Sequence, residues 1–470
     1  MEDTIICSEK VSATIWGDTN TPRLEQAHRL IKVEDLDGAL GLLDPKEILW
    51  EIKDNMHARE EDRSLLRGGL QALILRIDVL RAKGLTLERI EEICAIYEDV
   101  CRIAAEKQEW EWVMLYNYAA FLYELNNHEA FGRGYDILKH NKKNREKAIE
   151  IAERLNRMIE TEAKAGIGRE EQADVHHLLG LLYTSSRRFL EAEAAFVKAI
   201  SLWETLRQEK SGYESELAKG YHDLGVLYLE DRDHALQEQG AESAFRRAIE
   251  IRRRLCELGT DACATDLAQS YERLASLLFT ERRLEEAVAH YEKAIGIWGD
   301  MLLCRPNTSV DRKVEICYRN AHMACLERLT ELGAGHMLFG QIALKTKELL
   351  RSRVRLYSAL AEVEPEKYEL RLCEAYHDLV AECMRIFYHE TKDDAFQAVT
   401  MYARQYRAKP DPAIGDALKR HCALLKNVYA FAPYEREREE LEDELRALGI
   451  NCVGENLAIT REFERNGKNF

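Results

Sequence analysis

Six polar side chains recur at one position of an internal repeat and together could bind a ligand. Each stands two residues before an apolar residue that anchors its repeat. The six are Asn117, His177, His222, Glu272, Arg319 and His377. At helical spacing the same face continues two and five residues after each anchor. Apolar residues of that continuation include Phe121, Leu181, Val226 and Phe279.

Such a row suits the recognition of a protein or peptide. Polar side chains can hydrogen-bond the backbone of an extended segment, and apolar side chains between them form pockets for its side chains. We therefore predict that these ten residues line a partner-binding surface. Packing between repeats, or simple exposure of the polar positions, is the alternative interpretation. Because three of the six are histidines, binding that changes between about pH 5.5 and 8 is a further hypothesis.

The sequence contains none of the motifs that identify common enzyme classes. A glycine-rich phosphate loop, H-E-x-x-H and G-x-S-x-G are all absent. The acid pair Glu170-Glu171 stands at a predicted helix start, where it complements the helix dipole. The adjacent His176 and His177 point about 100° apart on a helix and cannot easily share a metal ion. We predict a protein that is not an enzyme, with no catalytic residue, cofactor or metal site.

The repeat that carries the polar row is clearest over residues 221–228 and returns at intervals of 45 to 60 residues. Its apolar anchors are Ala119, Leu179, Leu224, Leu274, Ala321 and Leu379. A period of this size, without strand-like alternation, predicts a solenoid of stacked helix pairs.

Spacing inside the repeats is also regular. Gly180 precedes Phe196 by 16 residues, and Gly225 precedes Phe245 by 20, with four extra residues between the helices. We expect the small residue to let paired helices approach, while the aromatic ring of the second helix fills the gap above it.

These residues resemble the tetratricopeptide repeat. That family carries an aromatic residue, leucine-glycine and tyrosine on the first helix, then alanine, an aromatic residue and alanine on the second. The clearest unit shows this signature as Leu179, Gly180, Tyr183, Ala192, Phe196 and Ala199. The long period is similar to the kinesin-light-chain-like subclass that is common in bacterial proteins. The resemblance implies an all-α, right-handed α–α superhelical solenoid whose first helices line a concave groove, and it implies that the ten residues lie in that groove.

The resemblance is strongest over residues 174–298 and weaker over 110–160 and 312–405. In the last stretch His322 and Val380 stand where the repeat has its small residue. The sequence predicts five parts. A flexible lead-in (1–21) precedes an N-terminal helical region of degenerate repeats or a separate cap (22–109). The repeat solenoid (110–405), C-terminal capping helices (406–453) and a tail (454–470) follow.

Helical spacing and breaker residues predict individual helices, and a loop over 126–144 separates the two helices of the first clear repeat. Six of the predicted helices outside the clearest repeats are 46–56, 61–83, 86–106, 309–332, 335–364 and 367–389, and the C-terminal capping helices are expected at 413–430 and 434–448.

Charge and cysteine usage narrow the partners. A net charge of −17 argues against binding to a phosphate backbone. The 12 cysteines form no C-x-x-C pair, which favours a reducing compartment, and no apolar run is long enough to cross a membrane. We predict a cytoplasmic scaffold for a protein or peptide partner, with no nucleic-acid or membrane binding. The alternative is a peptide-sensing adaptor of a bacterial signalling or effector system, with helices 22–106 as its output module. The oligomeric state is left open.

Overall fold

A computed structural model describes most of the chain between residues 22 and 408. The described ranges are 22–55, 63–107, 111–127, 135–161, 167–210, 212–231, 238–258, 262–386 and 392–408, with residues 418, 443, 450–451 and 458–459. The predicted lead-in, most of the predicted capping helices and most of the predicted tail lie outside these residues.

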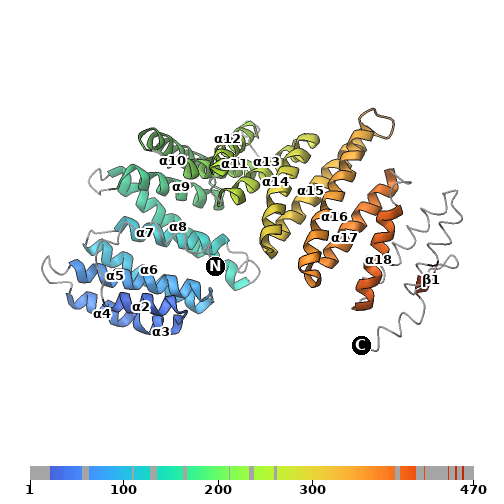
Figure 1. The fold of residues 1–470 in the computed structure, drawn as a ribbon. Helices are drawn as coiled ribbons and strands as arrows, with labels where there is room; N and C mark the ends of the chain where they lie inside the picture. Colours follow the sequence, from blue (N-terminus) through green and yellow to red (C-terminus); the bar gives the residue numbers. More distant parts are fainter. Residues whose placement is uncertain are drawn as a thin grey trace. The chain divides into compact units, whose positions relative to one another are not determined.

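The chain divides into two compact units, Met1–Tyr213 and Glu214–Phe470. In both, most helices pack on the next along the chain, which confirms the predicted all-α solenoid of helix pairs. The helices of the first unit are α2 (Pro22–Lys32), α3 (Leu36–Leu42), α4 (Pro45–Asn55), α5 (Arg63–Ala82), α6 (Leu87–Lys107), α7 (Glu111–Asn127), α8 (Tyr135–Thr161), α9 (Arg169–Ser185) and α10 (Phe189–Glu209) (Figure 1).

The second unit continues the same pattern of stacked helices. Its helices are α11 (Glu214–Glu230), α12 (Glu238–Glu257), α13 (Ala262–Thr280), α14 (Leu284–Cys304), α15 (Thr308–Leu332), α16 (Phe339–Val363), α17 (Pro365–Ile386) and α18 (Lys392–Ala408). The six helices predicted outside the clearest repeats are confirmed, with ends that differ by a few residues. Among the described helices, none is both long and apolar enough to cross a membrane.

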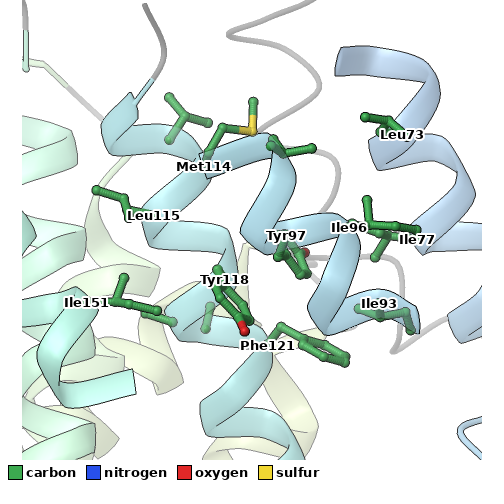
Figure 2. Packing of buried hydrophobic residues seen from close by; sticks show 14 of the residues in the cluster. Leu73, Ile77, Ile93, Ile96, Tyr97, Met114, Leu115, Tyr118, Phe121 and Ile151 are labelled. Carbon is green, nitrogen blue, oxygen red and sulfur yellow. The ribbon is translucent and has the colours of Figure 1, made fainter. Parts of the chain in front are cut away.

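Apolar side chains from successive helices form one continuous core in the first unit. Figure 2 shows its centre, where Tyr97 of α6 lies against Tyr118 of α7. The two rings stack with centroids 5.0 Å apart. The same cluster runs from Leu24 in α2 to Ala195 in α10, so the apolar core passes through the predicted boundary at residue 109 without a break.

Small residues bring paired helices together, as the sequence predicted. A Cβ atom at Gly180 of α9 would lie 2.6 Å from the ring of Phe196 on α10. A Cβ atom at Gly225 of α11 would lie 2.8 Å from the ring of Phe245 on α12. Both rings are fully buried. The aromatic residue therefore occupies the volume that any side chain at the glycine would need.

Arginines at the turns tie neighbouring helix pairs together. Arg188, at the start of α10, donates a hydrogen bond from Nη1 to Glu153 of α8 over 2.9 Å. Arg283, at the equivalent start of α14, donates one to Glu242 of α12 over 2.6 Å. Each bond joins a turn to the preceding helix pair, so it adds to the apolar contacts that set the stacking order.

Two parts of the sequence-based prediction are wrong. The loop over 126–144 is too long, because α8 already begins at Tyr135. The lysines and arginines of this polar stretch are good helix formers, and buried Ala148 and Ala152 anchor the helix further along. Near the C-terminus, the two-residue strands β1 (Ile450–Asn451) and β2 (Ala458–Ile459) pair antiparallel, which the sequence did not predict.

Candidate functional site

Three of the ten predicted groove residues are buried, which corrects the expectation that they face a ligand. The exposed fraction is 6% for His177, 9% for His222 and 2% for Phe121. The His177 ring lies between Phe196 and Trp203, with centroid distances of 5.6 and 5.4 Å. These side chains fill space between helices, so the packing interpretation holds for them.

His222 belongs to a buried polar cluster that joins α11, α12 and α13. Its Nδ1 lies 3.1 Å from the hydroxyl of Ser270. Arg252 of α12 donates a hydrogen bond to the same hydroxyl and another, 2.8 Å long, to the carbonyl oxygen of Asp266. Because buried polar groups need partners, this cluster fixes how the three helices meet.

Burial keeps the His222 imidazole neutral over the pH range of the binding hypothesis. Burial, followed by the nearby Arg252 guanidinium, lowers the pKa of His222 to about 4. Asp223 acts in the opposite direction, and Arg273 lowers the pKa slightly. Titration of His222 therefore offers no basis for binding that changes between about pH 5.5 and 8.

Acidification from pH 7 to 5 is expected to lower the free energy of unfolding, with about 1–2 kcal/mol of the loss due to His222. The unfolded histidine titrates near pH 6.5 and the folded one near 4. Between these values the unfolded chain binds a proton that the folded chain excludes, so stability falls as the pH falls. His222→Asn, whose amide can replace Nδ1 toward Ser270, should flatten this dependence in urea unfolding. His336→Asn, at an exposed position, should not, and equal slopes for all three proteins would contradict the assignment.

The other seven predicted residues keep at least part of their surface. Arg319 is exposed, and the remaining six are half-buried. Val226 and Phe279 also pack against the apolar core of the second unit. Burial raises the pKa of Glu272, which Arg273 and Lys313 partly offset. Arg319 lines a defined pocket.

The pocket around Arg319 lies over α15, α16 and α17 of the second unit and has a volume of about 430 Å³. These three helices pack side by side (Figure 1). Helix α15 carries Arg312 and Arg319 seven residues apart, so both lie on one helical stripe. The lining residues are Arg312, Glu315, Ile316, Tyr318, Arg319, His322, Leu350, Arg353, Arg371 and Asp378.

A buried arginine holds the three helices at this pocket. Arg353 of α16 donates two hydrogen bonds to Glu315 of α15, 3.0 and 2.6 Å long, and a third to Asp378 of α17. Its side chain is only 8% exposed. This one guanidinium therefore links α16 to both α15 and α17. The two carboxylates that line the pocket, Glu315 and Asp378, are both paired with it.

His322 is a lining residue that the sequence marked only as a departure from the repeat. Its Nε2 is buried without a hydrogen-bond partner among the described residues, 3.9 Å from Glu382. Burial lowers the pKa of His322, and the Glu382 carboxylate opposes that shift. The imidazole occupies the position at which four other repeats have glycine or alanine, and this substitution was the one signal in the sequence.

The described part of the chain contains no candidate metal site. We find there no group of three or more histidine, cysteine, aspartate or glutamate side chains that could hold a metal ion. The described cysteines, including buried Cys317 and Cys325, are free thiols. Burial raises the pKa of Cys325 to about 11, which makes it a poor nucleophile.

Two stretches of the chain are tetratricopeptide repeats. The model of that family matches residues 173–202, in the α9–α10 pair, and residues 268–297, in the α13–α14 pair. In both units the small residue precedes the aromatic residue by 16 positions, Gly180 before Phe196 and Ala275 before Tyr291. Repeats of this class form scaffolds for protein interaction. No curated protein matches the sequence.

Several solved structures have a similar arrangement of helices. BtubC (BKLC) from P. vanneervenii is 19% identical, covers 56% of this chain and 92% of its own, and has a TM-score of 0.40. The apo form of RapI is 12% identical, with coverages of 87% and 96% and a TM-score of 0.40. Aspartyl phosphate phosphatase F from Bacillus subtilis is 14% identical, with coverages of 88% and 94% and a TM-score of 0.36. Because all three TM-scores are below 0.5, the fold assignment rests on the helix packing and on the matched repeats.

Proposed function

We propose that the protein is a non-enzymatic scaffold that binds a peptide or partner protein through carboxylate groups at the α15–α17 pocket. The observation that carries this proposal is the pocket of about 430 Å³, lined by four arginines, in a chain of net charge −17. In a chain with more acidic than basic residues, composition alone does not predict four arginines around one cavity. The proposal includes no cofactor, and the free thiols support a reducing, cytoplasmic setting.

The four arginines differ in their exposure and in the contacts that hold them. Arg353 is committed to Glu315 and Asp378. Arg371 donates a 3.0 Å hydrogen bond to Glu374. Arg312 and Arg319 are exposed on one stripe of α15. A guanidinium binds a carboxylate through two parallel hydrogen bonds, so this stripe favours an aspartate, a glutamate or a chain terminus.

Random peptides displayed on phage and selected on the full-length protein would test the proposal. We expect the selected peptides to be enriched in aspartate and glutamate. In fluorescence anisotropy, the Arg312→Ala/Arg319→Ala variant should bind them at least about tenfold more weakly, because charge-assisted hydrogen bonds are lost. Arg328→Ala, also on α15 but outside the pocket, should bind within about twofold of the unchanged protein. Peptides without acidic enrichment, or equal binding by the double variant, would overturn it.

The adaptor alternative is less favoured. It needs helices 22–106 to act as an output module, yet the apolar core of these helices continues into α7 and beyond. A module that moves independently of its neighbours is expected to have a separate core.

A further inference from the structure

The second unit contains another cavity, which lies between α14 and α16. It has a volume of about 490 Å³. Its apolar wall contains Ile295 and Leu303 of α14 with Leu349 and Leu356 of α16. Leu303 is 48% exposed. We call this cavity the α14–α16 groove, and none of the ten predicted groove residues lines it.

Two glycines leave this groove open without serving the packing of the described chain. A Cβ atom at Gly296 would meet no described atom within 4 Å outside its own helix. One at Gly299 would only touch Leu356, at 3.8 Å. Gly180, by contrast, faces a ring that leaves no room for a side chain. A glycine inside a helix weakens it by about 1 kcal/mol relative to alanine, so α14 twice carries a destabilising residue that no internal contact requires.

Acidic side chains border the groove. Glu292, Asp300 and Glu348 line it, and Arg355 is the one cation among its described lining residues. Lys345 pairs with Glu292 over 3.2 Å. Asp300 and Glu348 together outweigh Arg355, so the border keeps a negative charge. Apolar surface with an acidic border complements a partner that is apolar on one side and basic at the edges.

The shape of the groove fits a helix. Its lining on α14 runs from Glu292 to Leu303, about 17 Å or three helical turns. Small residues three positions apart let another helix approach closely and seat a large side chain above them. Leu344, one turn before Glu348 on α16, is 53% exposed and extends the apolar surface.

We propose that the α14–α16 groove binds a basic amphipathic helix of a partner protein. A large apolar side chain of that helix lies over Gly296 and Gly299, and lysines or arginines beside it pair with Asp300 and Glu348. The groove and the α15–α17 pocket have Tyr318 as a common lining residue, and their other lining residues differ.

Two synthetic amphipathic peptides of about five helical turns would test this proposal in fluorescence anisotropy with the full-length protein. Both carry the same leucine face, and the polar face is lysine in one and glutamate in the other. We expect saturable binding of the lysine peptide and at least about tenfold weaker binding of the glutamate peptide. Asp300→Lys/Glu348→Lys should reverse this preference.

Gly296→Leu provides the decisive variant, because Gly296 lines the groove and a Cβ atom there would meet no described atom within 4 Å outside its own helix. It should bind the lysine peptide at least about tenfold more weakly, as expected when a central contact is lost, and should be no less stable. Gly340→Leu, at another open glycine on α16, should bind as the unchanged protein does. The proposal is overturned if the lysine peptide fails to bind, if Gly296→Leu binds it normally, or if sedimentation shows that Gly296→Leu abolishes self-association and the occupant is a second copy.

Discussion

Arg353→Met is expected to lower the free energy of unfolding by about 3 kcal/mol at neutral pH, because it leaves two carboxylates near a buried position without their cation. The Glu315 side chain is 17% exposed and that of Asp378 is 41% exposed, so Glu315 carries most of the loss. The guanidinium also joins three helices, and its removal should loosen α15 and α17 against α16. Urea unfolding monitored by circular dichroism measures the change.

Two further variants separate the loss of charge pairing from the loss of side-chain volume. Arg353→Met/Glu315→Gln/Asp378→Asn removes all three charges and should recover much of the stability, since no uncompensated carboxylate is left. Arg328→Ala removes an arginine on the same unit that pairs near the surface with Glu285, and should leave the free energy of unfolding close to that of the unchanged protein. If Arg353→Met proves as mild as Arg328→Ala, the guanidinium does not hold these helices.

Gly180→Ala is expected to lower the free energy of unfolding by about 1–3 kcal/mol, although alanine is the better helix former. The added methyl group would lie 2.6 Å from two ring carbons of Phe196 and 2.8 Å from Cγ, the ring carbon nearest the backbone. The ring cannot yield at its far edge alone and must move as a whole. It is fully buried and contacts His177, so that movement disturbs the core between α9 and α10.

The matched control is expected to change the free energy of unfolding in the opposite direction. Gly296→Ala, also inside a helix, places its methyl group where no described atom lies within 4 Å. Only the gain in helix propensity then remains, so the free energy of unfolding should rise by about 1 kcal/mol. Equal effects at Gly180 and Gly296 would show that propensity, and not the contact with Phe196, decides the outcome.

The sequence did not show which of the six polar repeat positions are buried. His177, His222 and Arg319 stand at the same position of their repeats, yet two are buried and one is exposed. Their own helices do not cause this difference. Phe196 and Trp203, from the next helix, enclose His177. His222 is enclosed by Arg252 from the next helix and by Ser270 from the next helix pair.

The sequence also did not show which residues line the α15–α17 pocket together. Arg319 was identified by its repeat position, and His322 was noticed as a departure from the repeat. Arg353 and Arg371 lie on other helices and follow no repeat signature that would have linked them to Arg319. Charged side chains have no sequence period that shows which of them will share a cavity.

The sequence by itself determined the all-α architecture, the extent of most helices and the packing of Gly180 on Phe196 and of Gly225 on Phe245. These features depend on contacts within one helix or between two consecutive helices, so a regular spacing records them. The tertiary structure alone decided which polar side chains stay accessible and which arginines meet at one cavity. Exposure and charge pairing depend on side chains brought in from other helices, and the spacing of residues along one helix carries no information about those neighbours.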